Sequence, residues 1–265
     1  MSVDVKSITQ LREMTGAGML DCKSALEEGN CDMDKAIEIL RKKGVLKAAK
    51  KADRATKEGV IAIAKEDGRV AVVGLACETD FVARGAEFIA SVNEFAKQLL
   101  VSSENDFSTW ADDKIKNEMI VKIGENLQII AAKIIEGKII GSYLHSNLKV
   151  ASVVVLNGGS QELANDLAMQ VTAMSPSYIK PEDVDEAEKK KEMEIYREQL
   201  KNEGKNQAMW DKIIEGKLQK YYTDVCLLRQ TFIKDDKLSI EKLIKQESDK
   251  TGEKIEVVNF YRFSI

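Results

Sequence analysis

Residue types that metal sites and many catalytic sites require are scarce in this 265-residue sequence. It has one histidine, His145, and four cysteines that form no C-x-x-C pair, so a structural zinc site or a histidine-dependent nucleophilic triad is hard to assemble. The phosphate-binding motifs G-x-x-x-x-G-K-[S/T] and G-x-G-x-x-G do not occur. No pair of carboxylates is placed for acid–base chemistry. The sequence therefore predicts a binding protein that uses no metal or cofactor and is not an enzyme.

Long apolar runs and an excess of basic charge are also missing. No run reaches the ~18 apolar residues that a membrane-spanning helix needs. Residues 1–4 (MSVD) resemble neither the basic nor the apolar part of a secretory signal. The net charge is −4, whereas nucleic-acid-binding proteins are usually strongly basic. We therefore expect a cytoplasmic protein with reduced cysteines that binds neither a membrane nor nucleic acid directly.

Residues 1–44 carry the apolar spacing of three short helices. We expect these helices to stop at Gly16, Gly29 and Gly44, because glycine readily takes the left-handed conformation that ends a helix. Fewer than ~50 residues can bury only a thin core, so the unit suits binding better than catalysis. We predict an N-terminal three-helix docking module that includes a charged linker and spans residues 1–53.

The middle of the chain contains one pattern twice: a strand, a turn, a second strand, a join and a helix. The predicted strands are 59–65 and 70–77 in the first copy, and 138–144 and 149–156 in the second. The helices begin near Glu87 and Gln161, and a further helical stretch is expected over residues 111–135. We assign residues 54–137 to the first core unit.

Residues 182–224 change character, with narrow apolar seams in two strongly charged segments. This pattern is typical of an antiparallel helical hairpin. Afterwards an extended segment at 227–233, a helix capped by Ser239 and ended by Gly252, and a strand at 255–263 are expected. The hairpin is therefore an insertion in a second core unit made of residues 138–181 and 225–265. The predicted fold class is α+β.

The joins of the two copies differ in a way that suggests function. The second join, residues 157–160, is a plain Asn-Gly-Gly-Ser turn, whereas the first, residues 78–86, contains Thr79, Asp80, Phe81 and Val82. A large apolar side chain in a polar loop usually has a partner. Since the second copy closes without such an insertion, we interpret the first as a binding loop. The alternative is that Phe81 folds back onto its own core.

Several stretches together resemble one family, elongation factor Ts, the guanine-nucleotide exchange factors of elongation factor Tu. They are residues 11–23 (LREMTGAGMLDCK), 78–84 (ETDFVAR), 124–127 (GENL), 142–145 (SYLH), 202–205 (NEGK), 227–235 (LLRQTFIKD) and 261–263 (YRF). The resemblance extends from about residue 4 to residue 263. This sequence departs from the family's pattern at three places. Gly85 replaces a frequent asparagine, Thr231 replaces a usual proline, and residues 131–133 stand where arginines are common.

The resemblance implies a UBA-like fold for the N-terminal module and the GDP-bound form of elongation factor Tu as partner. It implies that Asp80 and Phe81 push in near the partner's Mg²⁺ and phosphate site, so that GDP is released, while Thr79 and Val82 shape the loop. Docking is implied for Arg12, Met19, Leu20 and His145. The resemblance also associates the hairpin with homodimer formation in some members.

Some alternatives stay open at this point. At least one of Met19 and Leu20 can belong to the helix core, and His145 can be a neutral turn residue. A competing function is that of an RNA-binding translation accessory protein that uses the eight basic residues of 41–57. That segment has no interleaved aromatic residues for base stacking, so a solvated linker or helix end is the plainer interpretation.

Overall fold

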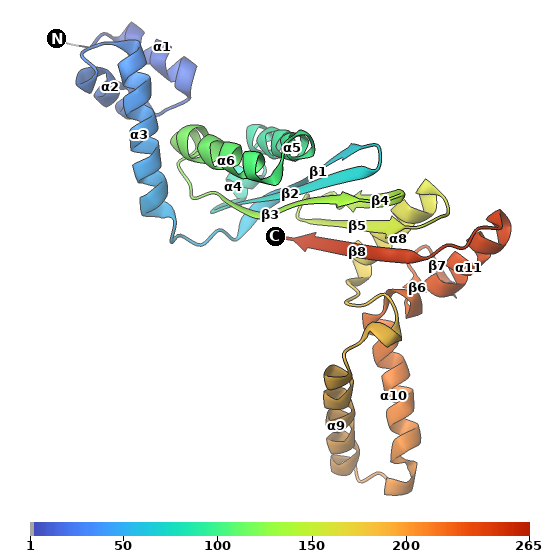
Figure 1. The fold of residues 1–265 in the computed structure, drawn as a ribbon. Helices are drawn as coiled ribbons and strands as arrows, with labels where there is room; N and C mark the ends of the chain where they lie inside the picture. Colours follow the sequence, from blue (N-terminus) through green and yellow to red (C-terminus); the bar gives the residue numbers. More distant parts are fainter. Residues whose placement is uncertain (1–2) are drawn as a thin grey trace.

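The molecule has three parts arranged along an elongated body (Figure 1). The computed structural model describes residues 3–265, without the side chains of residues 45–50 and 104. A three-helix unit lies at one end, two small sheets with their helices form the middle, and a helical hairpin projects from the second sheet's unit. The predicted α+β class is confirmed. Within the described residues, no helix is both long and apolar enough to cross a membrane.

The N-terminal unit consists of α1 (Val5–Thr15), α2 (Met19–Glu28) and α3 (Met33–Lys51). The side chain of Asp4 caps α1 by accepting from the Ser7 N–H at 2.7 Å. Gly16 ends α1 in the left-handed conformation, with φ of 69°. The small core of the unit is fully buried at Leu11, Cys22, Ala25 and Leu26.

The expected end of the third helix at Gly44 is wrong, because α3 continues to Lys51. Gly44 serves close packing instead of helix termination. A Cβ placed on it would lie 2.4 Å from Cγ2 of Val121 and 2.9 Å from the carbonyl oxygen of Lys116. Only a residue without a side chain lets α3 approach the core helices this closely. The N-terminal unit is thus packed on the core by its third helix.

The two copies of the strand–turn–strand–helix pattern are confirmed. They are β1 (Glu58–Glu66), β2 (Arg69–Cys77) and α5 (Ala86–Val101), followed by β4 (Ile139–Leu144), β5 (Val150–Leu156) and α8 (Gln161–Met174). Each pair of strands is antiparallel. Each of these two pairs is extended by a third strand, so the strand orders are β1-β2-β3 and β4-β5-β8.

The helix expected over residues 111–135 is only half right. Helix α6 (Glu104–Lys114) continues through a π-helical turn, η1 (Ile115–Met119), into α7 (Ile120–Ile123). Gly124 then ends the helix with φ of 83°, and β3 (Gln128–Glu136) pairs with β2. The β-branched residues of this segment fit a strand, and pairing with the open edge of β2 overrides the helical spacing.

The two sheets pack on each other and carry helices on their outer faces. On β2, Ala71, Val73 and Leu75 face the helices α5 and α6. The alternate residues Val70 and Val72 face the second sheet and meet Val153 and Val155 of β5. Because both faces of β2 are covered, every residue from 70 to 77 is buried.

The hairpin is formed by α9 (Glu186–Asn202) and α10 (Trp210–Val225), as expected. Short 3-10 turns lie before, within and after it: η2 (Pro181–Asp183), η3 (Gln207–Met209) and η4 (Leu227–Arg229). The segment predicted as extended therefore starts as a 3-10 turn. The chain ends with β6 (Thr231–Phe232), β7 (Asp235–Ser239), α11 (Ile240–Thr251) and β8 (Val257–Ser264).

Fully buried glutamines fix the hairpin's root to the second sheet's unit. Gln170 Nε2 donates to the Thr231 carbonyl at 3.0 Å, and its Oε1 accepts from the Ile233 N–H at 2.9 Å. Gln230 Nε2 donates to the Asp224 carbonyl at 3.1 Å. Buried amides satisfied in this way set one orientation for the elements they join. The unit boundaries at residues 53, 137, 181 and 224 stay a prediction.

Two helix-interior glycines provide a matched test of the packing at Gly44. We expect Gly44→Ala to destabilise the protein, because the overpacking at Val121 and the Lys116 carbonyl costs roughly 1–3 kcal/mol. Gly216→Ala in α10 has open space around it and should stabilise by roughly 0.5–1 kcal/mol. Urea unfolding of both variants measures the difference. Equal stabilisation by the two substitutions would show that Gly44 is not a packing residue.

Candidate functional site

The Thr79–Val82 segment forms a single helical turn, α4 (Asp80–Ala83), directly after β2. Thr79 caps it, since its Oγ1 accepts from the Val82 N–H at 3.4 Å. Ala83 is buried and Val82 packs against the first core cluster. These two inward residues fix the turn on the protein, so Asp80 and Phe81 face outward.

Phe81 is 86% exposed, the largest exposed fraction among the large hydrophobic residues of the described chain. The alternative in which its ring folds back onto the protein's own core is therefore wrong. Asp80 is 43% exposed at its side chain, and its Oδ2 forms an ion pair with Arg84 at 3.1 Å. Exposed pairs of this kind contribute little to stability, so the Asp80 carboxylate is free to change partner.

Glu125 holds the start of this turn, a contact that the sequence analysis missed. Its Oε2 accepts from the backbone N–H groups of Glu78 at 2.9 Å and Thr79 at 3.0 Å. Its Oε1 accepts from the Thr79 hydroxyl at 2.6 Å. The only sequence signal was the GENL stretch, because Glu125 lies far from Thr79 along the chain.

Glu78 makes the reciprocal contact and extends it to the segment after α3. Its Oε1 accepts from the Asn126 N–H at 2.6 Å, and its Oε2 pairs with Arg54 at 3.4 Å. Asn126 Nδ2 donates to the carbonyls of Arg54 at 2.8 Å and Ala52 at 3.3 Å. Lys51 donates to the Gly124 carbonyl. The segment predicted as a linker is thus bonded to the turn that holds α4.

Burial favours the protonated form of the nearby Cys77 thiol. Burial, followed by the negative charges of Glu125 and Glu58, raises the pKa of Cys77 to about 11. The protonated thiol donates to the Thr79 carbonyl with Sγ 3.3 Å from the oxygen. All four cysteines are free, and of these Cys31 alone is exposed. Among the described residues, no group of three or more His, Cys, Asp and Glu side chains is arranged to hold a metal ion.

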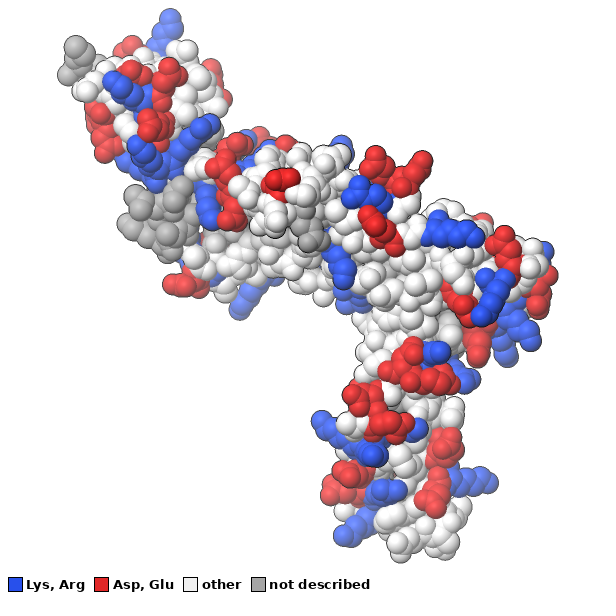
Figure 2. Space-filling view, in the orientation of Figure 1, with Lys and Arg blue, Asp and Glu red and all other residues white. Residues whose placement is uncertain are grey.

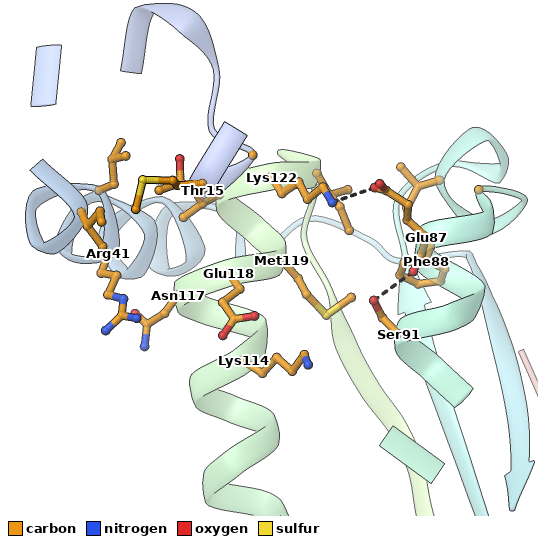
Figure 3. A pocket seen from close by; sticks show the side chains of 18 of the residues that line it. Thr15, Arg41, Glu87, Phe88, Ser91, Lys114, Asn117, Glu118, Met119 and Lys122 are labelled. Atoms are coloured by element: carbon orange, nitrogen blue, oxygen red, sulfur yellow. Dashed lines mark hydrogen bonds and ion pairs between the residues drawn. The ribbon is translucent and has the colours of Figure 1, made fainter. Parts of the chain in front are cut away.

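A cleft of about 920 Å³ separates the N-terminal unit from α4 and α5. The end of α1 at Met14 and Gly16 forms one wall, and Val82 and Gly85 belong to the other. Lys122 of α7 lies against Gly16, because a Cβ placed on Gly16 would be 3.0 Å from Cγ of Lys122. Figure 3 shows the Lys122 side chain reaching Glu87 of α5, with Nζ 2.9 Å from Oε2. The cleft is therefore bridged at its α7 side.

The predicted docking residues of the N-terminal unit are exposed together beside the α1–α2 connection. Arg12 lies in the last turn of α1 and is exposed. Met19 and Leu20 begin α2 and are 51% and 83% exposed. Neither residue is part of the helix core, so the alternative role as core does not hold. Their role in docking stays a prediction.

His145 lies in the β4–β5 turn and is exposed. Its Nδ1 accepts from the Asn147 N–H at 3.3 Å. Lys149 of the same turn pairs with Glu58, and Glu58 is the residue opposite Cys77 in the β1–β2 ladder. The His145 turn therefore lies at the end of the sheets where β2 leads into α4, the same end of the sheets at which the Phe81 turn begins.

Comparison with known proteins identifies the family of this chain. The family described as Elongation factor TS matches residues 78–265. A protein named elongation factor Ts from Lawsonia intracellularis is 40% identical over 100% of this chain and 99% of its own length. Those from Hydrogenobaculum sp. and Porphyromonas gingivalis are each 41% identical, again over 100% of this chain and 99% of their own length. The chain belongs to the elongation factor Ts family of translation elongation factors.

Proposed function

We propose that this protein binds elongation factor Tu in its GDP-bound form and speeds the release of GDP, without making or breaking a covalent bond. The observation that carries the proposal is the 86% exposure of Phe81 on a turn whose backbone is held by Glu125. An aromatic ring held in water by a fixed backbone is prepared for burial in a partner.

Asp80 and Phe81 act together at the partner's nucleotide site in this proposal. Phe81 enters an apolar space near the Mg²⁺ and phosphate groups, and Asp80 places a negative charge beside them. Mg²⁺ keeps several waters and few protein ligands, so small shifts in geometry loosen it. Thermodynamic reciprocity then requires GDP to weaken the exchange factor as much as the exchange factor weakens GDP. Abundant nucleotide therefore keeps the complex transient.

Docking through Arg12, Met19, Leu20 and His145 supplies the affinity for this step. Because α3 packs on the core at Gly44 and its end is bonded to the 124–126 turn, the docking surface and the Phe81 turn have a set spacing. Binding at the docking surface therefore also orients the Phe81 turn, so the second contact loses little further rotational entropy.

The RNA-binding alternative receives less support from the distribution of charge. Lys51 and Arg54 of the basic segment are used in bonds within the chain. On the face shown in Figure 2, basic and acidic side chains are interspersed over the core and the hairpin. An RNA-binding surface would instead gather positive charge along one face. A role of the hairpin in homodimer formation stays a prediction.

Replacement of the exposed ring tests the proposal. Phe81→Ala should slow GDP release from elongation factor Tu roughly 10–150-fold, because burial of a phenylalanine in a partner pocket is worth roughly 1.5–3 kcal/mol. Its melting temperature should stay unchanged, since the ring contacts water in the free protein. The measurement is fluorescent GDP release at saturating exchange factor.

Two exposed apolar residues serve as controls for Phe81. Met209→Ala, at the far end of the hairpin, removes a side chain that is 55% exposed and should leave GDP release unchanged. Leu20→Ala should raise the half-saturating concentration and preserve the maximal rate, as expected for docking. A Phe81→Ala protein that melts several degrees lower but exchanges normally would contradict the proposal.

The metal dependence tests the part assigned to Asp80. Asp80→Asn should lose part of the exchange activity and Asp80→Ala at least as much, and the deficit should shrink when Mg²⁺ is chelated, since GDP is then already loosened. Arg84→Gln removes the ion-pair partner but keeps the carboxylate, and should retain exchange. GDP release with and without chelator measures this. An equal deficit under both conditions would leave phosphate repulsion or docking as the role of Asp80.

A further inference from the structure

The turn at residues 124–126 meets the start of α4 although Glu125 and Thr79 are 46 residues apart. Gly124 reverses the chain after α7 with φ of 83°. The Glu125 carboxylate that follows receives three hydrogen bonds from the two residues preceding Asp80. Glu125 itself belongs to neither the docking surface nor the outward face of α4.

We propose that Glu125 is a positioning residue for the exchange step: its carboxylate fixes the direction in which α4 leaves the sheet, and thereby the place of Phe81 and Asp80. This inference rests on the proposed exchange function. Glu125 acts through the backbone of Glu78 and Thr79 and need not touch the partner's nucleotide site.

A four-residue helix cannot set its own direction. One helical turn is not stable in isolation, and the capping bond of Thr79 to the Val82 N–H is long, at 3.4 Å. The bonds to Glu125 are shorter, at 2.6–3.0 Å, and the negative charge of the acceptor strengthens them. The bonds from Glu125 therefore act together with the packing of Val82 and Ala83 on the core to set where α4 points.

The reciprocal bonds of Glu78 make the inference testable, because loss of Glu125 does not separate the two segments. The Asn126 N–H still donates to Glu78 at 2.6 Å, and Arg54 still pairs with Glu78 at 3.4 Å. Asn126 remains bonded to the Arg54 carbonyl. A Glu125 variant should therefore fold, with the start of α4 loosened.

Three substitutions separate position from charge. Glu125→Ala removes all three bonds, and Glu125→Asp withdraws the carboxylate by one methylene. Glu125→Gln keeps an oxygen that accepts from both backbone N–H groups and gains an NH₂ that donates to the Thr79 hydroxyl oxygen. If Glu125 acts by position, the Gln variant keeps its function and the Ala and Asp variants lose it.

Amide hydrogen exchange of the free protein gives the first readout. The amides of Glu78 and Thr79 should exchange at least about tenfold faster in Glu125→Ala, the factor that corresponds to 1.4 kcal/mol. Glu125→Gln should stay close to the wild type. The amides within β2, such as that of Val73, should be unchanged in both variants.

GDP release from elongation factor Tu gives the second readout. Glu125→Ala should lower the maximal rate about tenfold with little change in the half-saturating concentration, because the docking residues are intact. Glu125→Gln should restore most of the rate. Combining Glu125→Ala with Phe81→Ala should add little to the loss from Phe81→Ala alone, since a misplaced ring and a missing ring have the same effect.

Other results would overturn the inference. They are a Glu125→Ala protein with wild-type amide exchange and rate, or Ala and Gln variants that are equally slow and equally destabilised. If the wild-type protein does not speed the release of GDP from elongation factor Tu at all, the proposed function fails. In that case the comparison of amide hydrogen exchange between Glu125→Ala and Glu125→Gln alone decides whether Glu125 holds the start of α4.

Discussion

Burial of the central strand β2 on both faces is the constraint on which the site depends. The helices α5 and α6 cover one face and the second sheet covers the other, so the strand is buried from residue 70 to residue 77. At Glu78 the chain leaves this environment, and its backbone N–H groups need acceptors. Glu125 supplies them from the end of the neighbouring helix. The exposure of Phe81 follows from the direction that these bonds and the inward packing of Val82 and Ala83 give to α4.

The same turn joins the N-terminal unit to the site. Lys51 and Asn126 bond residues 51–54 to the 124–126 turn, and Gly44 lets α3 lie against the π-helical turn and α7. Single π-helical turns inside α-helices occur frequently at functional sites. The exposed residues Arg12, Met19 and Leu20, the cleft and the Phe81 turn are thus parts of one framework, and in the proposed function partner recognition and the exchange step share it.

The sequence predicted local elements well and non-local contacts poorly. Apolar strand runs, turn residues and helical apolar spacing located β1, β2, β4, β5, α5 and α8, and Ser239 and Gly252 correctly bounded α11. The comparison of the two joins correctly indicated that Phe81 is unusual. Helical spacing over 124–135 was misleading, because pairing with β2 decides that segment. Gly44 was wrongly predicted to end a helix, and the role of Glu125 was missed, since both residues act through contacts with residues distant in the chain.

A photocrosslinker at position 81 tests the central claim most directly. The variant carries benzoylphenylalanine in place of Phe81, and the measurement is the site and yield of its crosslink to elongation factor Tu. The account predicts crosslinks in the nucleotide-binding domain beside the Mg²⁺ and phosphate site, with a yield that falls as Mg²⁺ and GDP are added, as reciprocity requires. Crosslinks to another domain, or a yield that Mg²⁺ and GDP leave unchanged, would contradict it.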